Sequence, residues 1–348
     1  MQPRNKNILV IGPSWVGDMV MAHSLVQLIR RTEQKANIDI LAPAWCAPLI
    51  ARMPEVRTLI ETSFVHGALD WRERWAVAKQ IREKSYDHSY VLPNSFKSAL
   101  VPWLAKIPVR TGFTGEQRFV LLNDRHILNK ARWPLMVQRF AALHDEKLAD
   151  GLPAVPKPRL SIDARLLSST LGDLGLNVTN KNTMILCPGA EFGAAKQWPS
   201  HYYAELARQR IAAGWQVWLM GSKNDERVCQ QVASADRRIV NLAGRTSLLQ
   251  AIDVMSCANL VVTNDSGLMH VAAALQRPVV AIYGSTDPAF TPPLGENSKV
   301  VRLGLDCSPC FKRQCPLGHL NCLNQLPVDM VTDQIDDLLG STSKEVSI

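Results

Sequence analysis

The chain has 348 residues, of which 47% are hydrophobic and 20% charged, and its formal net charge is +8. This balance is typical of a folded protein and excludes a disordered one, and the length predicts one large or two medium domains. No run approaches the roughly 18 apolar residues of a membrane-spanning helix, and the N-terminus lacks a signal-peptide core. We therefore expect a cytoplasmic protein that does not span a membrane.

The positive charge favours anionic partners such as nucleic acid, an acidic membrane surface or phosphorylated substrates, although an ordinary solvated surface is also compatible with it. Lysines and arginines are scattered along the chain rather than gathered in a run, so we do not expect a nucleic-acid partner. The scattered pattern fits peripheral contact with anionic lipid.

Strands alternate with helices in the first half of the chain. The pattern predicts strands at 7–12, at 38–43 and at the apolar end of 86–94, with helices at about 18–31, 71–84 and 95–107, the last broken near Pro102. Such alternation implies parallel strands joined by helical crossovers.

A segment rich in proline and polar residues, 151–163, interrupts this alternation, as a linker would. We predict an N-terminal domain over 1–165, a linker over 166–182, a second domain over 183–327 and a terminal helix and tail over 328–348. The second domain repeats the pattern, with strands at 183–190, 215–222, 239–244, 259–265 and 278–285, and helices at 200–213, 225–235, 247–257 and 267–275. Two similar α/β halves predict two Rossmann-like domains that face a central cleft.

The most informative turn is the stretch "VTNDSGLMHVAAAL", residues 261–274, which passes from a strand into a helix. Free N–H groups at the helix start would point at an anion, and Gly267 lets a phosphate approach the backbone. Ser266 can donate its hydroxyl, and His270 lies one turn further on. Asp265 fits a helix cap or an acceptor for a ligand hydroxyl, because a bare carboxylate repels phosphate. A capped helix with a packed histidine and no ligand is the alternative.

Three other strand ends carry polar groups of the same kind. Lys196 follows a glycine-rich loop that lacks the P-loop spacing, yet its point charge can neutralise diphosphate oxygens. Asp225 and Glu226 offer carboxylates to ribose hydroxyls, and the loop around Thr246 can hold a base. Together these loops predict a nucleotide-diphosphate site, and the missing G-x-G-x-x-G argues against NAD.

The turn "GPSWVGDMV", residues 12–20, is the corresponding feature of the first half. Asp18 begins a helix there and is either a helix cap or a general base that deprotonates an incoming hydroxyl. Ser14 and Trp15 could position that acceptor. Lys97 and Arg118, with Arg110 and Arg139, could bind acceptor phosphates or carboxylates, or they are ordinary surface charges.

Four cysteines lie within sixteen residues near the C-terminus: Cys307, Cys310, Cys315 and Cys322. Their spacing is compatible with a structural zinc ion or an iron–sulfur cluster, with His319 as a substitute ligand, and equally with reduced thiols or a disulfide formed on oxidation. We expect no catalytic role for them. No D-x-D segment offers a divalent-metal site, so we expect transfer chemistry to need no cofactor.

Five stretches in order carry a resemblance over nearly the whole chain: "ILVIGPSWVGDMVM", "LAPAWCAPLIARMPEV", "YVLPNSFKSALVPWLAKIPVRTGF", "CPGAEFGAAKQWP" and "TNDSGLMHVAAAL". Together they resemble the ADP-heptose:lipopolysaccharide heptosyltransferases of glycosyltransferase family 9. The resemblance implies a GT-B fold and inverting transfer of L-glycero-D-manno-heptose from ADP-heptose to the first heptose of heptosyl-Kdo-lipid A, at the cytoplasmic face of the inner membrane. Transfer by a heptosyltransferase of the first step, or by another GT-B transferase or epimerase, is the alternative.

The resemblance also implies roles for individual residues. The catalytic aspartate falls on Asp18, the phosphate-contacting lysine on Lys196 and the ribose carboxylate on Glu226, beside Asp225. Thr246 lies where the family's chain passes the adenine. The donor turn D-[ST]-G-x-x-H falls on Asp265, Ser266, Gly267 and His270. The cysteine cluster departs from family members that lack one.

Overall fold

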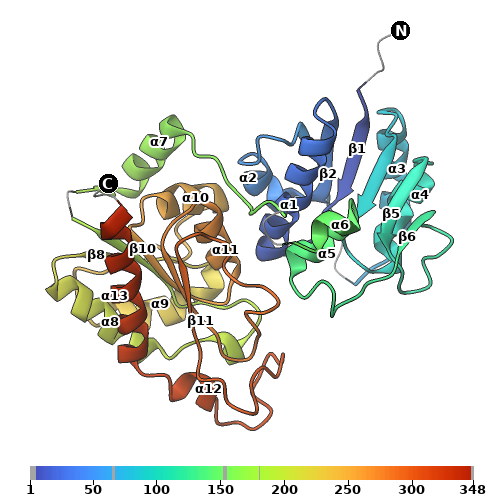
Figure 1. Ribbon diagram of the computed structural model, residues 1–348. Helices are drawn as coiled ribbons and strands as arrows, with labels where there is room; N and C mark the ends of the chain where they lie inside the picture. The colour runs from blue at the N-terminus through green and yellow to red at the C-terminus, as the bar shows by residue number, and fades with distance from the viewer. Residues whose placement is uncertain (1–4, 65–66, 152–154, 180, 346–348) are drawn as a thin grey trace. The chain divides into compact units, whose positions relative to one another are not determined.

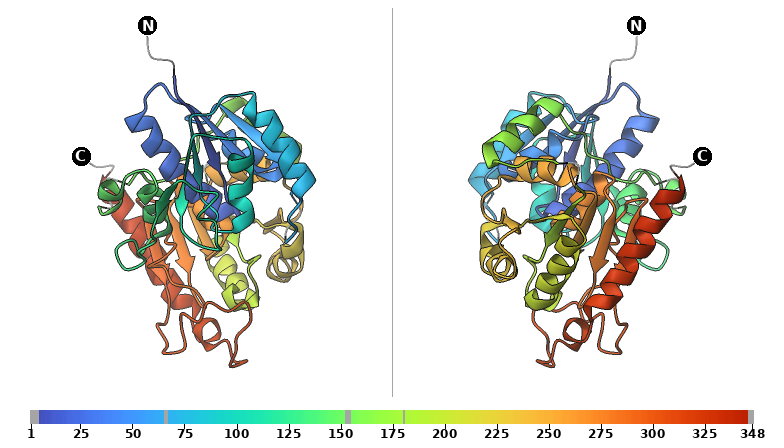
Figure 2. Two further views of the ribbon diagram at one scale, coloured as in Figure 1. Left: turned by 90° about the vertical axis from the view of Figure 1, so that its right-hand side faces the viewer. Right: turned by 90° about the vertical axis from the view of Figure 1, so that its left-hand side faces the viewer.

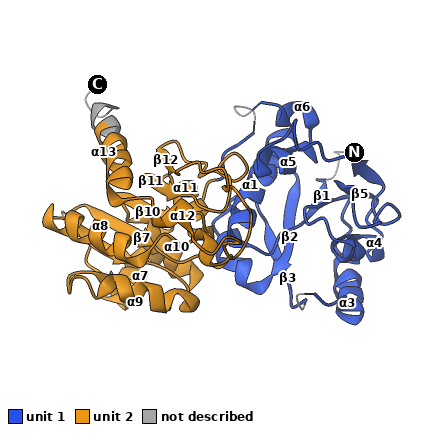
Figure 3. Ribbon diagram, turned by 90° about the horizontal axis from the view of Figure 1, so that it is seen from below, with its two compact units in different colours: residues 1–158 blue, residues 159–348 orange. Residues whose placement is uncertain are grey.

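The structure is a computed structural model that describes residues 5–64, 67–151, 155–179 and 181–345. The chain divides into two compact units, residues 1–158 and 159–348 (Figure 3). Where the sequence predicts a linker over 166–182, the structure has helix α7, Ala164–Leu174. Its N-cap Asp163 accepts hydrogen bonds from the Arg165 and Leu166 N–H groups, and it ends at Gly175, whose φ of +64° closes the helix. Asn180 lies outside the described residues.

Unit 1 is built on a six-stranded parallel sheet with the order β3-β2-β1-β4-β5-β6 (Figures 1 and 2). The strands are β1 Asn7–Ile11, β2 Asn37–Pro43, β3 Thr58–Thr62, β4 His88–Val91, β5 Val109–Phe113 and β6 Asp124–His126. The α-helices are α1 Val16–Thr32, α2 Ala47–Ile50, α3 Trp71–Arg82, α4 Leu100–Leu104, α5 Met136–Ala142 and α6 Glu146–Ala149. This strand order is that of a doubly wound nucleotide-binding fold. Strands β2 and β3 are added on one side of β1 and strands β4 to β6 on the other, so the strand order reverses between β1 and β4.

Unit 2 repeats this order in a second six-stranded parallel sheet, β12-β11-β10-β7-β8-β9. The strands are β7 Thr183–Cys187, β8 Gln216–Leu219, β9 Val240–Asn241, β10 Leu260–Asn264, β11 Val279–Ile282 and β12 Ser298–Val301. The helices after α7 are α8 Ser200–Ala212, α9 Glu226–Ala233, α10 Leu248–Ser256, α11 Gly267–Ala274, α12 Asn321–Asn324 and α13 Val328–Glu345. The reversal falls between β7 and β10, and the prediction of two Rossmann-like units is confirmed.

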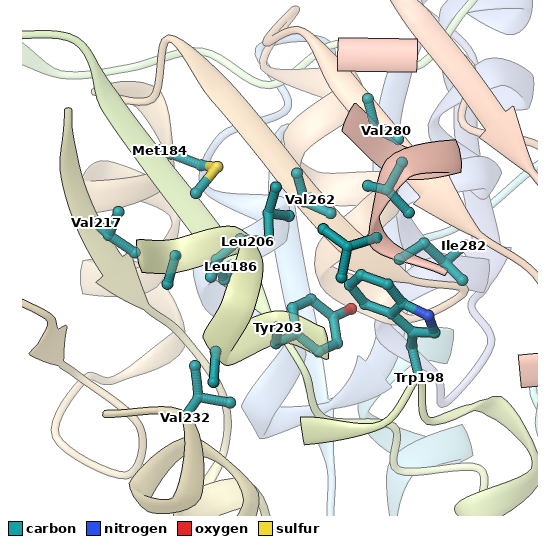
Figure 4. Packing of buried hydrophobic residues seen from close by; sticks show 14 of the residues in the cluster. Met184, Leu186, Trp198, Tyr203, Leu206, Val217, Val232, Val262, Val280 and Ile282 are labelled. Carbon is teal, nitrogen blue, oxygen red and sulfur yellow. The ribbon is translucent and has the colours of Figure 1, made fainter. Parts of the chain in front are cut away.

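The core of unit 2 forms because its central strands are apolar on both faces. Every residue of β7, β10 and β11 is buried, as expected for a parallel sheet covered on both sides. On one face, Leu186, Val262 and Ile282 pack with Tyr203 and Trp198 (Figure 4). None of the helices formed by the described residues combines the length and apolar character needed to cross a bilayer.

Trp198 joins this core to the C-terminal part of the chain. Its indole is fully buried, its Nε1–H donates to the Leu326 carbonyl at 2.9 Å, and its ring lies 4.9 Å from that of Tyr203, edge to face. The pairing satisfies a polar N–H inside an apolar core, which is the usual condition for burying tryptophan.

The change Trp198→Phe should lower the free energy of unfolding by about 2–4 kcal/mol, because it leaves a cavity and an unpaired carbonyl. Urea unfolding followed by circular dichroism measures this. The partly buried Trp215, changed to phenylalanine, is the matched control and should lose clearly less. Equal losses in the two variants would contradict this reading of the core.

Candidate functional site

The loops that follow β7 and β10 form the candidate site, because these strands are neighbours at the point where the strand order of unit 2 reverses. In open α/β sheets, ligands bind beyond the carboxyl ends of the strands at this position. The loop after β7 leads to Lys196, and the turn after β10 contains Asp265, Ser266 and Gly267. The structure therefore brings together residues far apart in the sequence.

The side chain of Asn264, at the end of β10, fixes both ends of the 188–198 loop. Its Nδ2 donates to the carbonyls of Pro188 at 2.8 Å and Gly189 at 3.2 Å. Its Oδ1 accepts from the Trp198 N–H at 3.0 Å and the Tyr203 hydroxyl at 3.1 Å. Sequence analysis did not assign a role to this residue. It could have been recognised as an amide, which both donates and accepts hydrogen bonds, at the end of a buried strand.

Lys196 and Asp265 form a partly buried ion pair. The Nζ of Lys196 lies 2.6 Å from Oδ2 of Asp265, and the Thr286 hydroxyl donates to the same oxygen at 2.6 Å. Asp265 is only 4% exposed. The predicted role of Asp265 as a helix cap is not observed, because the N-cap is the next residue, Ser266. The carboxylate instead holds the lysine in place, and its role as an acceptor for a ligand hydroxyl stays a prediction.

The first turn of α11 presents its N–H groups without a side-chain cap. Ser266 has extended backbone angles, and its hydroxyl lies 3.2 Å from that of Thr263 instead of capping the helix. The leading N–H groups of a helix have no partner within the helix, and the helix dipole favours a negative charge there. With Gly267 as the first helical residue, this end of α11 has the properties of a phosphate site.

His270 is 5% exposed, and burial lowers the pKa of its imidazole to about 4. It is therefore neutral near pH 7. The neutral imidazole can form a hydrogen bond with a ligand, but it adds no positive charge to the candidate phosphate site at the start of α11.

The two neighbouring acidic residues after β8 have different roles. Asp225 accepts hydrogen bonds from the N–H and the hydroxyl of Ser222, both at 2.8 Å, and so closes its own turn. Glu226 is exposed, and its side chain lies against the backbone of Gly244. A Cβ atom added to Gly244 would be only 2.2 Å from the Glu226 Oε1. Of the two, Glu226 is the carboxylate accessible to a ligand, next to the loop that carries Thr246.

The predicted acceptor residues belong to unit 1. Asp18 is the third residue of α1, directly beyond β1, where the dipole favours a carboxylate. Ser14 is exposed and the Trp15 side chain is 48% exposed. Lys97 is half-buried, with Nζ 3.5 Å from the Ala68 carbonyl.

Arg118 differs from its predicted role as a surface ligand, because it is fully buried. Its guanidinium donates to the carbonyls of Phe113 and Pro93 and to the side chain of Asn94, at 2.6–2.9 Å. Burial lowers its pKa to about 10, at which it is still charged near pH 7. Arg118 is a structural residue that ties together the backbone beyond β4 and β5, and Arg110 and Arg139 likewise donate to backbone carbonyls.

The C-terminal cysteines are free thiols that line one pocket together with His319, Ala195 and Ser285. The four are Cys307, Cys310, Cys315 and Cys322. Across the part of the chain that the structure describes, no group of three or more His, Cys, Asp or Glu side chains is placed to hold a metal ion. The predicted zinc ion or iron–sulfur cluster is thus not supported. The segment instead packs against the loop before Lys196, where the Ala195 N–H donates to the Arg313 carbonyl at 3.1 Å.

Two doubly wound units, with an open helix start and a lysine at the strand ends of the second, are the architecture of the GT-B class of glycosyltransferases, to which the solved structure compared below belongs. The family model of glycosyltransferase family 9 (heptosyltransferase) matches residues 74–321, and the chain belongs to this family. This confirms the family that the five sequence motifs indicate.

Individual relatives match over nearly their full length. Lipopolysaccharide heptosyltransferase 2 of Salmonella typhimurium is 44% identical over 343 residues, covering 96% of this chain and 98% of that protein. Lipooligosaccharide heptosyltransferase 2 of Haemophilus influenzae is 47% identical over 352 residues, covering 96% and 99%. The solved structure of Escherichia coli ADP-heptose lipopolysaccharide heptosyltransferase II has a TM-score of 0.85 at 43% identity, covering 97% and 99% of the two chains.

The buried neutral imidazole of His270 predicts a defined pH dependence of stability. Its pKa is about 6.5 in an unfolded chain and about 4 in the fold, so between these values the unfolded chain binds the extra proton and stability falls as the pH falls. From pH 7 to pH 4, the wild type should lose on the order of 3 kcal/mol more unfolding free energy than His270→Gln. Urea titrations at both pH values measure this, with the exposed His201→Gln as control. A pH dependence of His270→Gln equal to that of the wild type would contradict it.

Proposed function

We propose that this chain transfers L-glycero-D-manno-heptose from ADP-heptose to the first heptose of the Kdo-containing lipopolysaccharide inner core. The observation that carries the proposal is the 44–47% identity, over nearly full length, to heptosyltransferase 2 proteins of several bacteria. Lipopolysaccharide heptosyltransferase 1 of Pseudomonas aeruginosa is 29% identical. The difference favours the second heptose transfer over the first.

The proposed donor site lies in unit 2. The diphosphate is bound by the first turn of α11 and by Lys196, the ribose hydroxyls by Glu226, and the adenine by the loop at Thr246. The open N–H groups of α11 and the position of Glu226 beside Gly244 support this arrangement. The neutral His270 contributes a hydrogen bond, and Asp265 keeps Lys196 oriented towards the ligand.

The proposed reaction is a single in-line displacement that inverts the anomeric carbon. Asp18 removes the proton of the acceptor hydroxyl, whose oxygen bonds to the anomeric carbon as the bond to the diphosphate breaks. Positive charge develops on the sugar ring and negative charge on the departing ADP, where preorganised donors are most effective. The place of Asp18 at the end of β1, the ligand-binding edge of its sheet, supports its role as the base.

The proposed acceptor surface comprises Ser14, Trp15 and Lys97, whose exposure or partial exposure supports contact with a sugar or phosphate. Arg118 supports this region from beneath through its backbone hydrogen bonds. Because the acceptor, heptosyl-Kdo-lipid A, is anchored in a bilayer and the chain carries a net charge of +8, we place the protein at the cytoplasmic face of the inner membrane, in peripheral contact with anionic lipid.

The function is tested by incubating the chain and ADP-heptose with truncated core acceptors that carry zero, one or two heptoses. Transfer to the acceptor with one heptose, and to neither of the others, is expected. Transfer to the heptose-free acceptor would identify a first-step enzyme. Free heptose or isomerised donor, formed without an acceptor, would indicate a hydrolase or an epimerase.

The variant Asp18→Asn should lower kcat by at least about 100-fold, because the amide cannot accept the acceptor's proton, while ADP still binds. Steady-state transfer assays and calorimetric titration with ADP measure the two effects. Asp163→Asn is the control, because it also replaces a carboxylate at a helix start and asparagine still caps the helix. This variant should transfer heptose at the wild-type rate. Transfer by Asp18→Asn at the wild-type rate would eliminate Asp18 as the base.

A further inference from the structure

The donor site has little net positive charge of its own. The charge of Lys196 is offset by Asp265 at 2.6 Å, and the imidazole of His270 is neutral near pH 7. The departing ADP carries a strongly negative diphosphate, and among the groups assigned so far only the helix dipole and one paired lysine offset that charge. A further cation from a neighbouring segment would balance this charge.

The cysteine-rich segment lies directly against the loop that carries Lys196. The Arg313 carbonyl accepts from the Ala195 N–H at 3.1 Å, and the Phe311 N–H donates to the Ser285 carbonyl at 2.7 Å. A Cβ on Gly193 would lie 2.4 Å from the Arg313 carbonyl oxygen, and the φ of this residue, +146°, itself favours glycine. The backbone of Arg313 is therefore held against Ala195, the residue that precedes Lys196.

The side chains of Arg313 and Lys196 share one aromatic ring. The Lys196 Nζ is 4.8 Å and the Arg313 Cζ is 5.6 Å from the centroid of Phe192. Both distances are within the range of a cation–π contact, which holds a cation without neutralising it. Arg313 is exposed whereas Lys196 is partly buried, so the Arg313 guanidinium is accessible to a ligand.

We propose that Arg313 binds the diphosphate of the donor beside Lys196 and stabilises the negative charge of the departing ADP. The inference rests on the proposed function, because it takes the ligand to be an ADP-sugar. A planar guanidinium suits this role, since it can donate two parallel hydrogen bonds to phosphate oxygens. It also gives the cysteine-rich segment a function that needs no metal: the segment delivers Arg313 to the donor site.

The test is calorimetric titration of the full chain with ADP, and displacement of ADP by adenosine, for the wild type and three variants. Arg313→Gln removes the charge, Arg313→Lys keeps it, and Lys312→Gln removes the adjacent exposed charge as the matched control. Arg313→Gln should weaken ADP binding by about tenfold and change adenosine binding by less than about twofold. Arg313→Lys should recover part of the affinity, and Lys312→Gln should bind ADP like the wild type.

Wild-type ADP affinity in Arg313→Gln would overturn the inference. An equal loss of ADP and adenosine binding would do the same, because it would show a structural effect on the whole site. Failure of the wild-type chain to bind ADP would instead refute the proposed function on which the inference rests. The two failures are thus distinguished within one set of titrations.

Discussion

The buried amide of Asn264 is the interaction on which the arrangement of unit 2 depends at its ligand-binding edge. It donates to the backbone where the chain leaves β7 and accepts from the backbone where the chain enters α8, so the loop between them has two fixed ends. Lys196 lies within that loop and reaches Asp265, the residue after Asn264. A carboxylate or an aliphatic side chain could not donate and accept in this way, and the buried carbonyls would lose their partners.

Sequence analysis predicted the architecture well where the local pattern was strong. The central strands of both sheets are short, mostly apolar runs bounded by turn residues, and their predicted positions agree with β1, β2, β7, β10 and β11 to within a few residues. The uncapped helix start at Ser266 and Gly267 was predictable for the same reason, because a helix start after a buried strand is defined by adjacent residues. The strands it missed, β3, β5, β6 and β12, are short and include exposed or partly exposed residues, which weakens their hydrophobic signal.

What sequence analysis could not predict depends on contacts between distant segments. The pairing of Asp265 with Lys196 follows from the strand order, and periodicity does not determine strand order. Arginine is usually a surface residue, and only the fold shows that four acceptors surround the Arg118 guanidinium: two backbone carbonyls and the side chains of Asn94 and Ser98. The cysteine spacing was compatible with a metal site and with free thiols alike, because spacing measures separation along the chain, whereas a metal ion requires ligands that converge on one point in space.

The close approach of Gly193 to the Arg313 carbonyl links two parts of the sequence that are 120 residues apart. Any side chain at position 193 would push the distal segment away from the lysine loop, and any shift of that segment would free the loop to move. A side chain at position 193 can therefore be accommodated only if the backbone at Arg313 moves with it. The spacing between these two stretches of chain is thus set by the absence of a single methyl group.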